Sequence, residues 1–390
     1  MNDASTDDFR QEIRTWLAEN LTGRFAGARG LGGPGREHEA FELRRDWDRN
    51  LAAAGWTCVG WPVEHGGRGA TPAELVVFHE EYARADAPVR LGHIGEELLG
   101  PTLIAYGSPE QQARHLPGIR AAEHLWCQGY SEPGAGSDLA NVATRAERDG
   151  DEWVITGQKV WTSLAHVAGW AFVLCRTEPG STRHHGLSYL LVPMDQPGVE
   201  VRPIVQLTGT SEFNEVFFDG ARARADDVVG EVGGGWAVAL GTLAFERGAA
   251  TLGQQVGFRR ELERVVATAA RTGALDDPVL ADRLARAWAE LEVMRAHALR
   301  TGGGAHGAGQ ANVTKLLWAR WHRTLGELAV AVQTDGGLVA AGPPYDLTDA
   351  QRLYLFSRAD TLYGGSDEVQ RTVLAERVLG LPREPKGAQA

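Results

Sequence analysis

The spacing of apolar residues along the chain changes twice. From residue 7 to about residue 123, apolar positions recur every three or four residues, which is the period of an amphipathic helix. The clearest of them are Phe9, Ile13, Trp16, Leu17, Leu75, Phe78 and Tyr82. Glycine and proline interrupt the pattern at 30–35 and 61–69, where we expect loops between helices. This first part of the chain is therefore predicted to be helical.

A second pattern begins near Leu125, where β-branched and aromatic residues gather in short runs separated by turn residues. Such runs are typical of β-strands. The strands expected from them are Trp153–Ile155, Trp170–Cys175, Leu187–Val192, Val199–Ile204 and Phe213–Phe218. Asp149-Gly150 predicts a hairpin turn, and Asp219-Gly220 is expected to end a strand. We therefore expect an antiparallel β-domain.

Helical spacing returns after the glycines at 233–235. Two apolar stripes carry it: Leu280, Leu284, Trp288, Leu291 and Met294 on one, and Val313, Leu316, Trp321, Leu325, Leu328 and Val332 on the other. Ser366 is expected to cap a last helix, which Gly380 and Pro382 end. The predicted fold is therefore α+β, with an N-terminal helical domain (1–124), a middle antiparallel β-domain (125–233) and a C-terminal helical bundle (234–390).

Composition and charge narrow the possible functions. The 390 residues are 43 % apolar and 23 % charged, as in an ordinary globular protein. A net charge of −12 argues against an extended nucleic-acid surface. Three scattered cysteines form no CxxC pair, and no histidine has the spacing of a metal ligand, so we expect neither disulfides nor a metal site. No apolar run is long enough to cross a membrane, and the acidic N-terminus does not resemble an export signal. We therefore expect a cytoplasmic protein.

Three segments could hold a ligand. The glycine-rich segment 128–138 offers backbone N–H groups and the hydroxyls of Ser131 and Ser137 to a pyrophosphate or a flavin edge, although a plain turn at a sheet edge would have the same composition. Segment 157–163 places Trp161 and Ser163 at a strand end, where an indole can stack on a flat ring. Segment 363–371 places a tight turn against a helix N-terminus.

With Phe245-Glu246-Arg247 and the run 333–337, these segments resemble the acyl-CoA dehydrogenase family of flavoenzymes, from about Phe9 to Arg383. The resemblance implies a helical domain, a β-domain and a four-helix bundle, with FAD as cofactor. The positions that it implies for FAD binding are Gln128, Tyr130, Ser131, Gly136, Ser137, Trp161, Ser163, Gln333, Gly337, Ser366 and Glu368. Gln333 and Gly337 match residues that reach the FAD of a neighbouring subunit.

The resemblance also implies a catalytic glutamate that takes the α-proton of an acyl-CoA while the β-hydrogen leaves as hydride. In many members this glutamate follows the tyrosine of the last motif, but here that position is Gly364. Other members carry it before an arginine on a bundle helix, which Glu246 and Arg247 match. The alternative is that these two residues form a solvated helix pair. Glu246 is thus the expected base, Arg247 lies on the substrate side, and the Gly364 N–H is expected to hold the thioester oxygen.

The implied reaction is FAD-dependent α,β-dehydrogenation of an acyl-CoA to the trans-2-enoyl-CoA, with electrons passed to an electron-transferring flavoprotein. The absent side chain at Gly364 predicts a bulky, branched or long acyl group, with a steroid side chain as one option. Alternatives are an acyl-CoA oxidase, a flavin monooxygenase, or a non-catalytic subunit of a mixed complex. The segment 271–278 lacks the Arg-x-x-Phe-Gly motif of homotetrameric members. We therefore expect either a homo-oligomer with altered contacts or an α2β2 heterotetramer with a related subunit.

Overall fold

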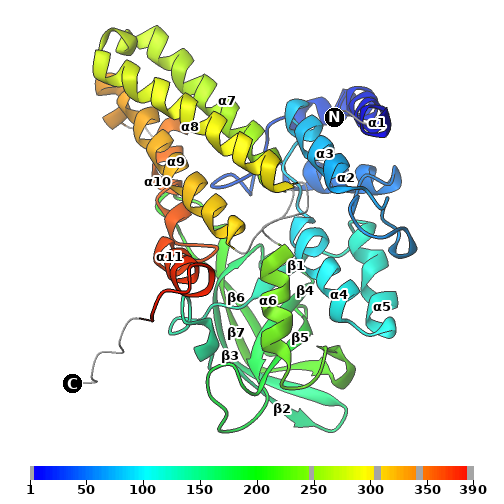
Figure 1. The fold of residues 1–390 in the computed structure, drawn as a ribbon. Helices are drawn as coiled ribbons and strands as arrows, with labels where there is room; N and C mark the ends of the chain where they lie inside the picture. The colour runs from blue at the N-terminus through cyan, green and yellow to red at the C-terminus, as the bar shows by residue number, and fades with distance from the viewer. Residues whose placement is uncertain (1–3, 246–249, 303–308, 340–345, 384–390) are drawn as a thin grey trace, which may run out of the picture. The chain divides into compact units, whose positions relative to one another are not determined.

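The chain divides into two compact units, residues 1–250 (unit 1) and 251–390 (unit 2). The computed structural model describes residues 4–245, 250–302, 309–339 and 346–383. Helices fill the beginning of unit 1, strands follow between residues 126 and 229, and helices return from residue 235 onward (Figure 1). The α+β fold expected from the apolar pattern is confirmed. The domain boundaries expected at residues 124 and 233 remain predictions.

The N-terminal helices of unit 1 pack in two apolar cores, one formed by α1, α2 and α3 and the other shared by α4 and α5 with the sheet. They are α1 (Ala4–Asn20), α2 (Phe41–Ala53), α3 (Pro72–Arg84), α4 (Gly100–Tyr106) and α5 (Pro109–Arg120). The predicted stripe residues Ile13 and Leu17 pack against Trp47 and Leu51 of α2. Thr71 begins α3 with a reciprocal capping box to Glu74, which satisfies two backbone N–H groups at the helix start.

A single sheet of eight strands follows. The strands are β1 (Trp126–Gly129), β2 (Arg145–Asp149), β3 (Glu152–Ser163), β4 (Trp170–Arg176), β5 (Leu187–Pro193), β6 (Val199–Pro203), β7 (Phe213–Arg224) and β8 (Val228–Val229). Their order is β6-β7-β3-β2-β4-β5-β8, with β1 beside β4. The pairs are antiparallel, as expected, except that β1 and a single residue of β2 pair in parallel with β4.

Two glycine turns predicted in the sheet have different outcomes. Gly150, at φ +58°, makes the tight turn between β2 and β3, so the predicted hairpin is confirmed. Gly220, at φ +75°, does not end a strand, because it lies inside β7 where the register with β3 shifts by one residue. A β-bulge and a strand end can both require a left-handed glycine, and the local sequence does not distinguish them.

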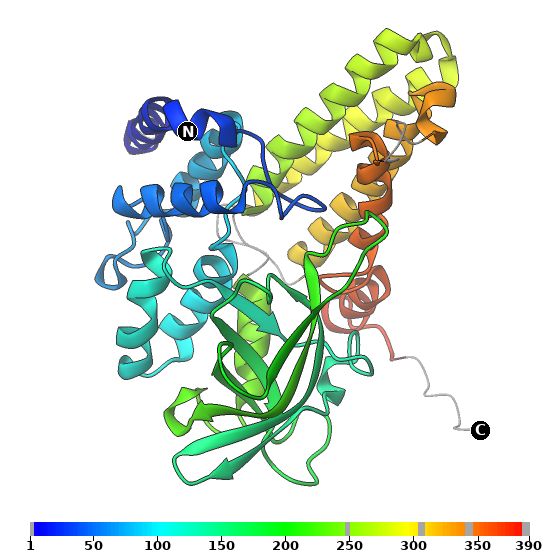
Figure 2. The ribbon, with the colours of Figure 1, turned by 180° about the vertical axis from the view of Figure 1, so that it is seen from behind.

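Helix α6 (Gly235–Phe245) belongs to unit 1 and packs along the sheet. It contacts α4 and β5, and Figure 2 shows the sheet from its other side, with α6 along the far face. Val238 and Ala239 of α6 join Leu99, Leu103 and Tyr189 in one buried cluster. None of the described helices combines the length and apolar character needed to cross a lipid bilayer.

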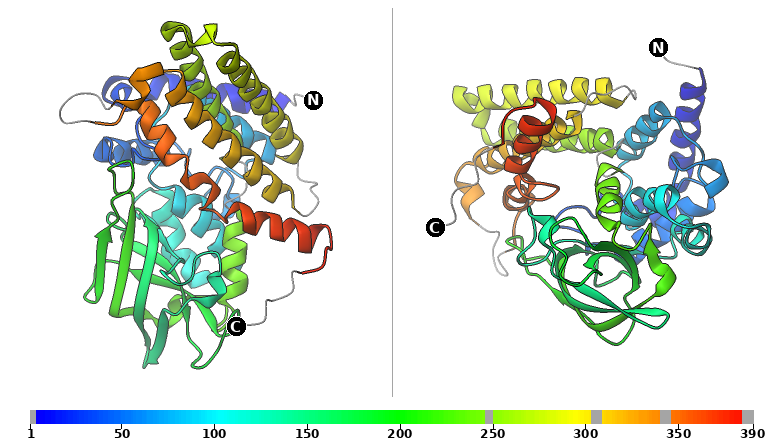
Figure 3. Two further views of the ribbon diagram at one scale, coloured as in Figure 1. Left: turned by 90° about the vertical axis from the view of Figure 1, so that its left-hand side faces the viewer. Right: turned by 60° about the horizontal axis from the view of Figure 1, so that its bottom comes forward.

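Unit 2 is a helical bundle. Its helices are α7 (Ala250–Thr272), α8 (Pro278–Gly302), α9 (Gln310–Ala331), α10 (Asp349–Phe356) and α11 (Asp367–Val373). Residues of α7, α8 and α9 form its core, with α10 packed against it (Figure 3). Ser366 caps α11 by accepting a hydrogen bond from the Val369 N–H, which confirms the predicted cap. Trp288 is the exception on its stripe: it is 43 % exposed and lies under the guanidinium of Arg259.

Candidate active site

The chain leaves β1 through a turn that holds part of the predicted flavin site. The predicted residues here are Gln128 on β1 and Tyr130, Ser131, Gly136 and Ser137 in the turn. Glu132 and Ala135 exchange two backbone hydrogen bonds of 3.0 Å, which close the turn. Tyr130 is buried, whereas Gly136 and Ser137 are exposed. The Gln128 Nε2 atom is buried without a hydrogen-bond partner among the described residues. This is expected of a donor whose partner is a bound ligand.

A buried ion pair holds this turn against β3. The ammonium of Lys159 lies 2.7 Å from the Glu132 carboxylate and also donates to the carbonyls of Tyr130 and Leu174. The carboxylate accepts a further hydrogen bond from the Thr144 N–H. Burial raises the pKa of Glu132, but Lys159 and the backbone donors outweigh it and hold this pKa below its ordinary value. Burial lowers the pKa of Lys159. Together these contacts fix the turn to the middle of the sheet.

Two residues further along β3, Trp161 projects from a break in the strand. The pairing of β3 with β7 shifts between Lys159 and Thr162, and Trp161 adopts φ +60°. A left-handed backbone costs a non-glycine residue about 1 to 2 kcal/mol, so such positions are often functional. The Trp161 side chain is 58 % exposed. The indole meets Phe213 of β7 edge-on, with ring centres 6.2 Å apart, and most of it remains exposed.

The bulge also brings β3 against the turn. The Val160 N–H donates to the Ser131 carbonyl at 2.9 Å. Ser163, the last residue of β3, is half-buried opposite Phe213 of β7. The structure therefore brings Ser131, Trp161 and Ser163 into one region of unit 1, as the resemblance implies, and does so through backbone contacts that the sequence motifs do not reveal.

In unit 2 the predicted oxyanion-binding position lies on a left-handed glycine turn. Gly364 and Gly365 have φ of +63° and +86°. The Gln370 amide donates to both of their carbonyls, at 3.0 and 3.1 Å, and the Asn312 amide in turn donates to Gln370. A side chain at position 365 would lie 2.4 Å from the Gln370 amide nitrogen. The turn is therefore closed on one side by a buried amide pair.

The other predicted residues of unit 2 fall into two groups. Gln333 and Gly337 lie in the segment after α9, where a Cβ at Gly337 would lie 2.4 Å from the Val330 carbonyl. Close packing alone therefore requires that glycine. Ser366 and Glu368 lie at the start of α11, and Glu368 is exposed. The pKa of Glu368 lies below its ordinary value because its own backbone N–H and the Ser366 hydroxyl donate to it.

The expected base lies outside the described residues. The structure describes α6 as far as Phe245 and α7 from Ala250, and Glu246 and Arg247 fall between them. Their roles therefore remain predictions from the sequence resemblance.

The sequence analysis missed two buried ionic clusters. One is the Lys159–Glu132 pair, and the other joins Glu261, His322 and Asp360 in unit 2. Only three residues of the chain are lysines, and one of them falls within a strand-forming run, which is a signal for the first cluster. No local signal marks the second, because its histidine is 38 and 61 residues from its carboxylate partners.

Models of one protein family match nearly the whole chain. The acyl-CoA dehydrogenase N-terminal, middle and C-terminal domains match residues 3–123, 127–221 and 233–379. A curated relative from Mycobacterium tuberculosis, acyl-CoA dehydrogenase IpdE1, is 65 % identical over 383 residues, covering 98 % of this chain and 99 % of the relative. The chain belongs to the acyl-CoA dehydrogenase family. The expected enzyme class is confirmed.

Solved structures of two family members resemble this acyl-CoA dehydrogenase over almost all of their length. The Tcur3481-Tcur3483 steroid ACAD has a TM-score of 0.84 and 32 % identity, covering 98 % of this chain and 99 % of that one. The ChsE4-ChsE5 complex from Mycobacterium tuberculosis gives a TM-score of 0.83 and 29 % identity, with 98 % and 99 % coverage. Both matches are to paired subunits, and one is described as acting on steroids.

Family members are generally FAD-dependent, and the residues of unit 1 fit that cofactor. An exposed indole on a bulged strand suits stacking against a flat ring system. The buried, unpartnered Gln128 amide suits the polar edge of such a ring. A Cβ at Gly134 or Gly136 would meet no atom within 4 Å among the described residues, so a phosphate could approach the backbone closely there.

Proposed function

We propose that this protein catalyses the FAD-dependent α,β-dehydrogenation of an acyl-CoA thioester to the trans-2-enoyl-CoA. The observation that carries the proposal is the 65 % identity to an acyl-CoA dehydrogenase over 98 % of the chain. Bound FAD would supply the hydride acceptor. The chain's own residues have three tasks: to hold the cofactor, to remove the α-proton, and to bind the thioester oxygen.

The cofactor would lie against the turn after β1 and the bulge of β3. Trp161 would stack on its ring, Ser163 and Gln128 would bind its polar edge, and the exposed turn around Gly136 would receive its phosphates. The other proposed contacts are Tyr130, Ser131, Ser137, Gln333, Gly337, Ser366 and Glu368. The buried Lys159–Glu132 pair supports this arrangement, because it holds the turn and the strand together.

We assign removal of the α-proton to Glu246. A glutamate at position 364 would be strained, since Gly364 has a left-handed backbone, and glycine has no group that could accept the proton. Glu246 follows α6, a helix that is mainly apolar. A carboxylate desolvated by a bound acyl chain has a raised pKa, which suits a general base near neutral pH. Arg247 would lie on the substrate side.

The Gly364 N–H would donate to the thioester oxygen as the α-proton leaves. A donor aimed at that oxygen in a site that excludes water lowers the barrier by several kcal/mol. The missing side chain at this position leaves room beside the reacting carbons. Together with the similarity to a steroid ACAD, this favours a bulky or branched acyl group, such as a steroid side chain.

The functional assembly we propose is an α2β2 heterotetramer with a related subunit, with an electron-transferring flavoprotein as acceptor. Two observations support the heteromer. The two structural neighbours described above are pairs of subunits, and the Arg-x-x-Phe-Gly motif is absent from segment 271–278. A homo-oligomer is the alternative.

The test compares wild-type protein with Glu246→Gln, each produced alone and with a related subunit. Polycyclic, branched and straight acyl-CoAs are supplied with a dye acceptor, and product mass and FAD content are measured. We expect a product lighter by two hydrogens from bulky substrates, and a rate at least about 10³-fold lower for Glu246→Gln with FAD retained. Glu263→Gln, at an exposed position of α7, is the matched control. Undiminished turnover by Glu246→Gln would contradict the assignment, and peroxide release in air would indicate an oxidase.

A further inference from the structure

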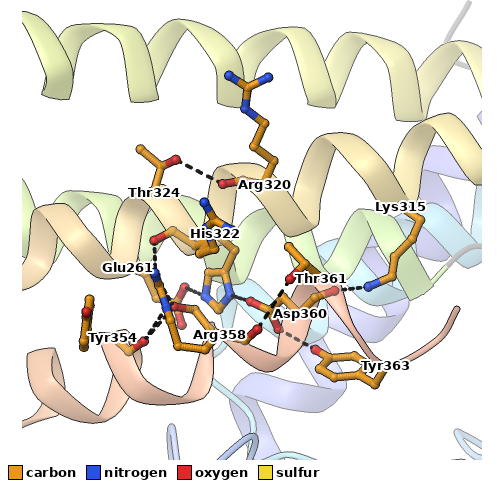
Figure 4. Close-up of polar contacts among 12 residues, drawn as sticks. Glu261, Lys315, Arg320, His322, Thr324, Tyr354, Arg358, Asp360, Thr361 and Tyr363 are labelled. Carbon is orange, nitrogen blue, oxygen red and sulfur yellow. Dashed lines mark hydrogen bonds and ion pairs between the residues drawn. The ribbon is translucent and has the colours of Figure 1, made fainter. Parts of the chain in front are cut away.

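His322 of α9 lies between two carboxylates from other parts of unit 2. Its Nδ1 atom is 2.6 Å from Asp360 Oδ2, and its Nε2 atom is 3.0 Å from Glu261 Oε2 (Figure 4). Asp360 belongs to the short helix Ala359–Thr361, and Glu261 to α7. One imidazole therefore joins three separate segments of the bundle through both of its ring nitrogens.

Two members of the Glu261–His322–Asp360 array are buried, and the third, Glu261, has a side chain that is 28 % exposed. The side chains of Asp360 and His322 are 1 % and 10 % exposed. Burial lowers the pKa of His322, but the hydrogen bonds and attraction of the two carboxylates outweigh it and raise this pKa to about 10. Lys315 donates to the Asp360 carbonyl and lies 4.2 Å above the Trp318 ring.

The array contacts the turn that carries Gly364 through the side chain of Tyr363. The Tyr363 hydroxyl donates to Asp360 Oδ1 at 2.7 Å, so the Asp360 carboxylate uses one oxygen for His322 and the other for Tyr363. Lys315 Nζ also lies 4.8 Å from the centre of the Tyr363 ring. Figure 4 shows Lys315 reaching the backbone carbonyl of Asp360 and Tyr363 reaching its carboxylate. The residue before Gly364 is therefore held by its ring and by its hydroxyl.

We propose that the Glu261–His322–Asp360 array positions the Tyr363–Gly364 turn, fixing the Gly364 N–H in the orientation that binds the thioester oxygen. This inference rests on the function proposed above. The array holds the turn on the Tyr363 side, and the Gln370 amide holds it on the other. A left-handed glycine has wide conformational freedom, so an N–H at such a position needs rigid neighbours to keep a fixed direction.

Two other roles explain the array less well. Among the described residues, no cluster of histidine, cysteine or carboxylate groups has the geometry of a metal site. General stabilisation is a poor explanation, because well-packed apolar residues often stabilise a core as much as buried ions do. A connected hydrogen-bonded array supplies a fixed orientation, and the segment that this array contacts is the turn at Gly364.

The test measures binding of two ligands that differ only in the carbonyl group. An enoyl-CoA thioester and the S-(2-alkenyl)-CoA thioether of the same carbon skeleton, which keeps the double bond, are titrated calorimetrically into the flavin-loaded protein. Tyr363→Phe removes a single hydrogen bond, Asp360→Asn weakens the array, and His297→Gln is the control. His297 is a half-buried histidine of α8 that bonds Thr314, in the same bundle but outside the array.

We expect Tyr363→Phe and Asp360→Asn to weaken thioester binding about tenfold while thioether binding changes by less than about twofold. His297→Gln should leave both affinities unchanged. Equal loss for both ligands, or loss for neither, would overturn the inference. If Asp360→Asn fails to fold, Tyr363→Phe alone tests the inference. The hydroxyl that this variant removes lies at the end of the array, so its loss should not prevent folding. Wild-type protein that binds both ligands equally would instead overturn the proposed role of the Gly364 N–H.

Discussion

The two units each use a lysine to fix a functional turn, but the surroundings of the two lysines differ. In unit 1, Lys159 lies in the sheet and pairs directly with Glu132 of the turn after β1. In unit 2, Lys315 lies in the helical bundle and donates to the backbone carbonyl of Asp360, whose carboxylate is paired with His322. The first turn is held by one direct ion pair, and the second by a chain of groups that includes an imidazole.

This difference predicts how each turn should respond to a change in pH. The sheet cluster contains no imidazole, and its two charged groups, Lys159 and Glu132, attract each other directly. The bundle cluster depends on the protonation of His322. We therefore expect the turn of unit 1 to be rigid over a wide pH range, and that of unit 2 to loosen in base.

The largest effect is expected from Lys159→Met. Removing one partner of a buried ion pair leaves Glu132 charged and unpaired, which costs about 3 to 5 kcal/mol. The free energy of unfolding, measured with urea, should fall by this amount, and FAD content should fall with it. Arg145→Met removes a cation from an exposed pair on β2 and should cost at most about 1 kcal/mol. A similar loss of unfolding free energy in both variants would show that the buried pair stabilises the fold no more than the exposed one.

His322→Gln should have a smaller effect that depends on pH. The pKa of His322 is about 10 in the folded protein against 6.5 when unfolded, so the folded state holds the proton more tightly. The stability that this proton supplies is fully present below pH 6.5 and declines as pH rises to about 10, by at most about 1.4 kcal/mol per pH unit.

Unfolding of wild-type and His322→Gln protein at several pH values measures this effect. We expect a difference of about 2 to 3 kcal/mol at pH 6 that shrinks steadily toward pH 10. Lys159→Met should show no such trend over the same range. A His322→Gln penalty that stays constant with pH would show that the imidazole is not charged in the folded protein.

The smallest stability effect is expected at Trp161. Replacement by glycine relieves the left-handed backbone and removes a largely exposed side chain, while it gives the unfolded chain more freedom. These effects oppose each other, so Trp161→Gly should change the free energy of unfolding by less than about 1 kcal/mol. FAD affinity should nevertheless fall markedly. A large loss of stability with unchanged FAD affinity would assign Trp161 to packing.

Local patterns predicted much of the fold. The glycine turn at 150 and the cap at Ser366 follow from residues within a few positions of each other, so the sequence contains the information. Gly220 was placed at a strand end because its bulge depends on pairing with β3. Trp288 has the spacing of a core residue, but its ring is covered only in part, by Arg259. Both errors arise from contacts between distant segments.

Residues of the candidate site likewise fall into two groups: those that local sequence predicts, and those that depend on contacts between distant segments. The motifs around Tyr130, Trp161 and Gly364 were found because each is continuous in sequence. The partners that hold them, Glu132 with Lys159 and Asp360 with His322, are 27 and 38 residues apart. A charged residue in an apolar pattern indicates that some partner exists, but only the folded chain shows which one it is. Glu246 and Arg247 still rest on the family resemblance.

The most direct test of the role proposed for Glu246 measures removal of the α-proton alone. An acyl-CoA with sulfur in place of the β-carbon has no β-hydrogen to lose, so only proton removal at the α-carbon remains possible. The protein is incubated with this compound in D₂O, and deuterium at the α-carbon is measured by mass spectrometry. We expect rapid exchange with wild-type protein and with Glu263→Gln, and none above the solvent background with Glu246→Gln. Equal exchange by Glu246→Gln and wild type would contradict the assignment of the base.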